Sequence, residues 1–222
     1  TVTDSYITSN YGAGAIVGGT TGWSDINSIS FENCKVTNCY IENTKASDTA
    51  PTGTNRANFA NAGLAGNLSS VQSSLTVNNC LVNANKYSVS GQQTSYAFVG
   101  FIQQNNITIS ISNSIADATA SLTQHGYFIN NESNYSNVYT LSPIDENAKS
   151  GNGTFAPTES QMKVVTAEQI TGAAAKTNMP GLDWNTAWLI TTGAPELRAL
   201  HNLITTDNGD GTHSVVCSDC DV

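Results

Sequence analysis

A short pattern that occurs three times constrains this chain more than any other feature. The copies read ISFENCKV at residues 29–36, LTVNNCLV at 75–82 and ISISNSIA at 109–116. A second pattern precedes each copy: GAIVG at 14–18, AGLAG at 62–66 and YAFVG at 96–100. Repetition with this spacing is typical of small units that bury their apolar faces by stacking on one another.

Apolar residues alternate before the shared asparagine of each copy, as Ile29 and Phe31 do in the first. This period predicts a strand with one buried face. After the asparagine the small and apolar residues continue one position out of phase, at Cys34 and Val36. The sequence therefore predicts a bend that reverses which side chains face inward, and asparagine tolerates the left-handed backbone that such a bend needs.

Equivalent positions of stacked copies are expected to lie above one another and to form columns of like side chains. Asn33, Asn79 and Asn113 are expected to form a ladder of side-chain amides, since each amide both donates and accepts hydrogen bonds. Cys34 and Cys80 are expected to stack beside this ladder as small buried thiols rather than as a disulfide.

Short strands separated by bends, with no helical period between the copies, favour an all-β fold of stacked parallel strands. We expect a right-handed parallel β-helix of about four coils, beginning near residues 12, 60, 94 and 124. The fourth coil is degenerate, with an eroded glycine pattern at 126–129 followed by Asn137.

The sequence changes character after the coils. It predicts coils over residues 1–157, a capping segment over 158–204 and a polar tail or linker over 205–222. The cap begins with helix-favouring residues from Thr158 to Lys176, broken at Thr166 and Gly172. Trp184 and Trp188 follow in an apolar segment that we expect to cover the open end of the core.

Charge limits the classes of partner. Only 11% of the residues are charged and the formal net charge is −9, so nucleic acid is a poor partner. No apolar run approaches the length of a membrane span, and we expect no membrane insertion. We expect the chain to be part of a longer multidomain protein.

The repeat alignment does not bring together a set of catalytic residues. Glycoside hydrolysis needs two carboxylates about 5 to 10 Å apart, but Glu32 aligns with Asn78 and Ser112. We therefore favour a protein that is not an enzyme, and we expect no catalytic residue and no cofactor. Acidic residues of the insertions, such as Asp25 and Asp48, leave a carbohydrate-active enzyme open as an alternative.

Two sets of residues are candidates for binding a ligand or a metal ion. Trp23 lies in a polar insertion, where it could stack on a sugar ring with Tyr11 or Tyr40 beside it and Asp25 nearby, although it could also fold back over the coil. In the tail, His213, Cys217 and Cys220 have spacings that suit three zinc ligands. The fourth ligand is missing, and a disulfide or an unstructured tail competes with this reading.

The glycine pattern followed by the Asn and Cys pattern resembles the GLUG-type repeat of large bacterial cell-surface proteins, over residues 12–140. TESQMK at 158–163, LDWNTAW at 182–188 and GAPEL at 193–197 look like the terminal element that follows such repeats. The tail is similar to spacer segments in surface proteins of gut Firmicutes. The resemblance implies an exported, wall-associated, adhesin-like protein with a right-handed parallel β-helix and no shared catalytic residue.

These observations favour an extracellular module on the surface of a gut bacterium, structural or adhesive, that binds a glycan or a host protein through loops of the first coil. One alternative is a β-helix polysaccharide lyase or glycoside hydrolase. Another, implied by the resemblance, is the accessory repeat region of a larger surface protease. A purely structural spacer, which would bind nothing, is also open.

Overall fold

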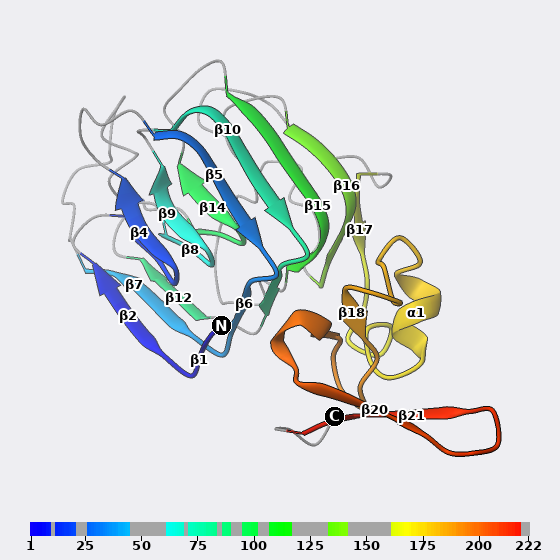
Figure 1. Ribbon diagram of the computed structural model, residues 1–222. Helices are drawn as coiled ribbons and strands as arrows, with labels where there is room; N and C mark the ends of the chain where they lie inside the picture. The colour runs from blue at the N-terminus through cyan, green and yellow to red at the C-terminus, as the bar shows by residue number, and fades with distance from the viewer. Residues whose placement is uncertain are drawn as a thin grey trace. The chain divides into compact units, whose positions relative to one another are not determined.

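The computed structural model of the chain describes residues 1–9, 12–20, 26–44, 61–68, 71–83, 86–89, 95–101, 107–116, 133–141 and 161–218. The chain divides into two compact units, Thr1–Val164 and Val165–Val222. The first unit is built from short β-strands, and every pairing described between them is parallel (Figure 1).

The described strands of the first unit range in length from two residues to nine residues. In chain order they are β1 (Val2–Thr3), β2 (Tyr6–Ser9), β3 (Ala13–Gly14), β4 (Val17–Thr20), β5 (Ile26–Glu32), β6 (Lys35–Thr37), β7 (Tyr40–Asn43), β8 (Asn61–Ala62), β9 (Ala65–Leu68), β10 (Val71–Asn78), β11 (Leu81–Asn83), β12 (Lys86–Val89), β13 (Ser95–Tyr96), β14 (Val99–Phe101), β15 (Thr108–Ala116), β16 (Ser133–Thr140) and β17 (Met162–Val164).

The three copies of the Asn and Cys pattern pair residue for residue. β10 lies between β5 and β15, and Leu75 is opposite both Ile29 and Ile109. Beyond the bend, β11 lies between β6 and β15 in the same register. The alignment of the copies in the sequence is therefore confirmed, and the long strands β5, β10, β15 and β16 run side by side in one sheet (Figure 1).

Strands continue the parallel sheet at both of its ends. β16 places Asn137 level with Asn113, as the degenerate fourth copy predicts, whereas its glycine pattern at 126–129 lies outside the described residues. β17 then adds Met162 opposite Val138. At the other end β1 pairs with β6, with Val2 opposite Val36.

The glycine patterns also lie in register, and two of their glycines are required by close backbone contacts. β3 pairs with β8, and β4 with β9, so that the first pattern aligns with the second. A Cβ atom on Gly14 would lie 2.3 Å from the carbonyl oxygen of Val17, and one on Gly66 would lie 2.4 Å from the nitrogen of Ala13. Real Cβ atoms do not approach backbone so closely, because non-bonded atoms repel one another strongly at these distances. Gly18 is different, since its nearest neighbour would be 3.6 Å away.

Left-handed residues mark two columns of bends. Asn33, Asn79, Asn113 and Asn137 have φ values between 50° and 53°, and Asp4 and Asn38 repeat this conformation at 50° and 53° in a second column. Asparagine and aspartate adopt this conformation more easily than other residues with a side chain, because their short polar groups can bond locally. The predicted bends are therefore present in every copy that the structure describes.

The amide ladder differs in detail from the one expected along Asn33, Asn79 and Asn113. Asn113 donates its side-chain amide to Oδ1 of Asn78 at 3.0 Å, one residue before the Asn79 bend, and Asn137 donates to Oδ1 of Asn113 at 2.9 Å. Asn78 stands at the end of β10 opposite Ser112, whose hydroxyl also donates to the same Oδ1. The bonds therefore run from β16 to β15 to β10.

The side chains that alternate inward form one apolar core in the first unit. It includes Phe31, Val36, Leu75, Val77, Cys80, Val82, Phe98, Ile109, Ile111, Val138 and Met162, all buried. Full burial of each large aliphatic or aromatic side chain contributes about 1.5–3 kcal/mol. The sequence predicts that the inward-facing positions shift by one residue after the asparagine, and the burial of Val36 and Val82 in this core confirms it. Leu81 and Ile115, which this change directs outward, are buried as well.

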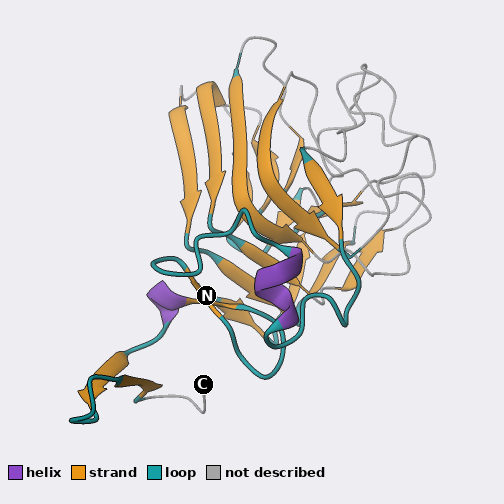
Figure 2. Ribbon diagram, turned by 90° about the vertical axis from the view of Figure 1, so that its right-hand side faces the viewer, coloured by secondary structure: helices purple, strands orange, loops and turns teal. Residues whose placement is uncertain are grey.

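The second unit contains little regular structure. Its elements are α1 (Ala174–Asn178), β18 (Trp188–Leu189), β19 (Glu196–Leu197), the 3₁₀ helix η2 (Arg198–Leu200), β20 (Leu203–Asp207) and β21 (His213–Cys217). Figure 2 shows how short the helical segments are among the described residues. β18 pairs with β19 in the antiparallel direction, and Trp188 is fully buried.

The prediction of helix from Thr158 to Lys176 is wrong for most of the described part. Met162–Val164 is instead a strand of the parallel sheet. Met162 is opposite Val138 and is buried, as Val138 is, so the segment gains both a strand partner and a place in the core. Thr166 starts a turn in which its hydroxyl accepts from the nitrogen of Gln169 and the Gln169 side chain accepts from the nitrogen of Thr166. This reciprocal arrangement is a capping box, but α1 follows only after Gly172.

The segment expected to be a polar tail or linker contains an ordered hairpin. β20 and β21 pair in the antiparallel direction, with Ile204 opposite Val216. The connecting turn is held by Asp207 and Asp210, which accept from the backbone nitrogens of Gly209 and Thr212. Ile204 and Val216 are about half exposed, at 48% and 50%.

Candidate functional site

A stacked pair of tyrosines lies on the sheet formed by β2, β7 and β12. Tyr6 of β2 is opposite Tyr40 of β7, and their ring centroids are 4.9 Å apart with an interplanar angle of 18°. In-register parallel pairing brings these rings together, because equivalent residues of neighbouring strands point to the same side. Tyr40 is partly buried, whereas Tyr6 is 66% exposed.

A carboxylate holds the outer tyrosine in place. The hydroxyl of Tyr6 donates a hydrogen bond to Oε2 of Glu42, two residues beyond Tyr40 on the same strand. This hydrogen bond raises the pKa of Tyr6 above its ordinary value, because ionisation would place two negative oxygens side by side. The ring of Tyr6 is thus fixed at its plane by Tyr40 and at its tip by Glu42.

This arrangement has the chemistry of a carbohydrate-binding surface. An aromatic ring with an exposed face packs against the apolar face of a sugar, and a carboxylate accepts hydrogen bonds from sugar hydroxyls. β2 is the outer strand of the sheet order β12-β7-β2, so Tyr40 covers one face of the Tyr6 ring and no described strand lies next to the other. In the third strand of this sheet, β12, Lys86 is opposite Tyr40 and Ser88 is opposite Glu42.

The site predicted from sequence is described only in part. Tyr40 is described, but Trp23, Tyr11 and Asp25 lie outside the described residues. Sequence reasoning missed Tyr6. The missed signal is a further repeat: residues 2–7 read VTDSYI and residues 36–41 read VTNCYI, which aligns Tyr6 with Tyr40.

Glu32 has no acidic residue opposite it on the described strands. Glu32 is opposite Asn78, which is opposite Ser112, as the repeat alignment predicts. Asp25 and Asp48 of the insertions lie outside the described residues. Among the residues that the structure describes, no group of three or more His, Cys, Asp or Glu side chains is placed to hold a metal ion.

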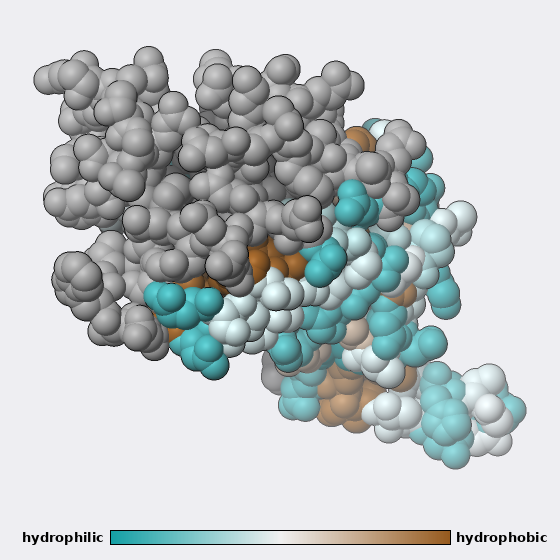
Figure 3. All heavy atoms as spheres, turned by 90° about the horizontal axis from the view of Figure 1, so that it is seen from above, coloured by the Kyte–Doolittle hydropathy of each residue, from teal (hydrophilic) through white to brown (hydrophobic). Residues whose placement is uncertain are grey.

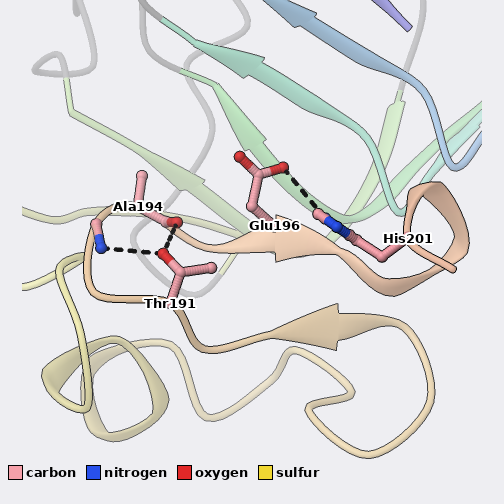
Figure 4. A network of polar contacts seen from close by, with 5 residues as sticks. Thr191, Ala194, Glu196 and His201 are labelled. Carbon is pink, nitrogen blue, oxygen red and sulfur yellow. Dashed lines mark hydrogen bonds and ion pairs between the residues drawn. The ribbon is translucent and has the colours of Figure 1, made fainter. Parts of the chain in front are cut away.

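One histidine of the second unit lies beside a carboxylate. Nε2 of His201 is 3.9 Å from Oε2 of Glu196 (Figure 4). In the same view the hydroxyl of Thr191 donates to the carbonyl oxygen of Ala194 at 2.8 Å and accepts from the nitrogen of Gly193 at 3.0 Å. The Thr191 hydroxyl is therefore committed to shaping its own turn rather than to a role beside the histidine.

The cysteine and histidine residues of the tail lie partly in the hairpin. His213 begins β21 and Cys217 ends it, and Cys217 is disulfide-bonded. A sulfur in a disulfide is not a thiolate, which is the form that ligates zinc. Cys220 lies outside the described residues, so the zinc set of His213, Cys217 and Cys220 remains a prediction for the reduced chain.

Cys34, Cys39 and Cys80 are free thiols. Cys80 is fully buried, as expected, whereas Cys34, for which burial was also expected, is only partly buried. Seen from above, the described surface is mainly hydrophilic to neutral, with smaller hydrophobic areas (Figure 3). None of the described helices has the length and apolar character needed to span a membrane.

Comparisons with known proteins give no match to this chain, whether with family models, curated proteins or solved structures.

Proposed function

We propose that this chain is a non-catalytic, extracellular module of a bacterial cell-surface protein of the GLUG-repeat type, which binds a glycan through exposed aromatic residues. The observation that carries the proposal is the Tyr6–Tyr40 stack with Glu42 at its tip. An exposed aromatic residue that is held rigidly loses little conformational entropy when a ligand binds, which favours affinity.

The same proposal includes a right-handed parallel β-helix as the scaffold. The support is that equivalent residues of successive copies are parallel neighbours, as Leu75 is to both Ile29 and Ile109. A winding of this kind suits a rigid stalk, since each copy would rest on the backbone hydrogen bonds and core of the next. The low charged fraction of 11% and the many Asn, Ser and Thr residues suit an exported surface without an anionic partner.

A glycan array probed with the full chain tests the ligand class. Wild type is expected to bind a subset of plant, mucosal or bacterial polysaccharides. Tyr40→Ala is expected to weaken that binding at least tenfold, because it removes the ring that supports Tyr6. Thr8→Ala is the matched control, since Thr8 is exposed on β2 opposite Glu42 but presents no aromatic ring. Trp23→Ala tests the additional residue expected from the sequence.

The same incubations are assayed for reducing ends and for unsaturated sugar products. Binding without product release is the expected result. Release of either product would overturn the proposal in favour of a polysaccharide lyase or glycoside hydrolase. Binding to no glycan, or equal binding by Tyr40→Ala and Thr8→Ala, would also contradict it and favour a spacer or a protein-binding module.

A further inference from the structure

Cys34 and Cys80 occupy the same position in neighbouring copies of the repeat. The flanking pairs are Glu32 opposite Asn78 and Lys35 opposite Leu81, which places the two cysteines opposite one another. The backbone between them is tied, since the nitrogen of Leu81 donates to the carbonyl oxygen of Cys34 at 2.8 Å.

The sulfur of Cys80 lies between its own copy of the repeat and the first copy, which carries Cys34. Its Sγ is 3.4 Å from the carbonyl oxygen of Asn78 and 3.3 Å from that of Phe31, which belongs to β5 of the first copy. The Sγ of Cys34 lies 3.5 Å from the carbonyl oxygen of Glu32, one residue further along. Parallel neighbours lie about 4.8 Å apart, and a disulfide requires Cα atoms about 4.4–6.8 Å apart. The spacing of the two backbones therefore falls within the range that a disulfide accepts, without a large backbone movement.

The two thiols differ in accessibility and in acidity. Cys80 is fully buried, whereas Cys34 is partly exposed. A hydrogen bond from the Cys80 thiol lowers the pKa of Cys34, and the same contact raises the pKa of Cys80. The thiolate is the nucleophile in disulfide exchange, so Cys34 is the residue that should react first.

We propose that Cys34 and Cys80 form a reactive dithiol that a small-molecule disulfide oxidises to a cross-link between the first and second copies of the repeat. The Cys34 thiolate attacks one sulfur of the reagent, forms a mixed disulfide and releases one thiolate, which takes up a proton. Cys80 then loses its proton and attacks the Sγ of Cys34, which displaces the second thiol of the reagent. Two protein thiols become one disulfide, and the reagent takes up the two electrons and two protons.

Serine is a conservative replacement in this column because the chain already uses it there. Ser114 stands at the equivalent position of the third copy, where its hydroxyl accepts from the nitrogen of Cys80 at 3.1 Å and donates to the carbonyl oxygen of Ser112 at 2.6 Å. Cys34→Ser and Cys80→Ser are therefore expected to fold. Cys39→Ser is the control, since Cys39 is also buried and is, with Cys34 and Cys80, one of the three described cysteines outside a disulfide.

The experiment treats the folded full chain with glutathione disulfide and follows it by intact mass and by mapping of non-reduced peptides. The proposal predicts that wild type and Cys39→Ser lose two hydrogen atoms and yield a peptide that joins Cys34 to Cys80. Cys80→Ser is expected to stop at a stable glutathione adduct on Cys34, because the resolving thiol is absent. Cys34→Ser is expected to react at least tenfold more slowly.

Three results would overturn the proposal, and the first two are read from wild type alone. One is a glutathione adduct that persists on Cys34 without cross-linking, and another is no reaction at Cys34. The third is equal rates of first reaction in wild type and Cys34→Ser, which would assign the reactivity to another thiol. None of these outcomes depends on whether the chain binds a glycan.

Discussion

Asn137 donates its side-chain amide to Oδ1 of Asn113 at 2.9 Å, and Asn113 donates in turn to Asn78 at 3.0 Å. Asn113 therefore serves two purposes at once, because it bonds to both neighbouring strands and its own φ is 50°. A residue of this kind combines a backbone requirement with a side-chain requirement, and substitution can separate the two.

Asn113→Gly and Asn113→Ala separate the two contributions to the free energy of unfolding. Glycine keeps the left-handed backbone but loses the amide, which is expected to cost about 0.5–1.5 kcal/mol per net hydrogen bond. Alanine loses the amide and also strains the backbone, which adds about 1 kcal/mol. Urea unfolding monitored by circular dichroism is expected to rank wild type above glycine above alanine. Equal stability of the two variants would show that the bend is not restrictive.

Gly14→Ala and Gly66→Ala are expected to destabilise the chain, and Gly18→Ala is expected to have little effect. The first two would place a Cβ 2.3 Å and 2.4 Å from backbone atoms, whereas at Gly18 the nearest atom is 3.6 Å away. Overpacking of this kind costs about 1–3 kcal/mol or more. Thermal unfolding of the three variants checks the prediction, which fails if Gly18→Ala is as unstable as the other two.

Glu42→Gln is expected to lower the pKa of Tyr6, because the neighbouring carboxylate is what raises it. The sign for stability follows from that direction. A pKa raised in the folded state contributes stability that is fully present below the unfolded value of about 10 and is lost as pH rises through the folded value. Titration of tyrosinate absorbance in wild type, Glu42→Gln and Tyr6→Phe identifies the Tyr6 transition. An unchanged transition in Glu42→Gln would contradict the hydrogen bond.

Asp183 is expected to make the second unit sensitive to acid. Its carboxylate accepts from the hydroxyl of Thr186 and from the backbone nitrogens of Thr186 and Asn185, and these bonds lower its pKa. A lowered pKa contributes stability that is present above the unfolded value and lost as pH falls through the folded one. Asp183→Asn is expected to reduce amide protection in residues 183–188 at neutral pH. Hydrogen exchange measured at neutral and at acid pH tests this, and the difference between variant and wild type should shrink in acid.

The sequence was sufficient to predict the repeated strands and their bends, because both depend on local rules. Alternation at Ile29 and Phe31 reports a strand, and a left-handed asparagine reports a bend. The further copy that contains Tyr6 was missed because only part of the repeated unit occurs there, without the two patterns by which the other copies were aligned.

Other elements could not be predicted because their state depends on distant neighbours. Met162 lies in a segment whose composition favours helix, but a parallel strand beside it supplies backbone partners and a buried position. Leu81 and Ile115 are buried although the alternation directs them to the other face from Val82 and Ala116, because alternation predicts which face a side chain takes and not whether that face is covered. The side-chain amide of Asn113 bonds to Asn78 rather than to Asn79, the residue at the equivalent position of the repeat. Register alone therefore does not determine the partner of a side chain.

The column that contains Cys34, Cys80, Ser114, Val138 and Met162 holds a thiol, a hydroxyl, a branched alkyl group and a thioether on one repeated backbone path. The ladder hydrogen bonds that align these positions are made by main-chain atoms, which every amino acid except proline supplies in full. The copies of such a scaffold can therefore diverge widely in sequence while each strand keeps its position. Their common origin would then be detectable from the backbone geometry after it can no longer be detected from the sequence.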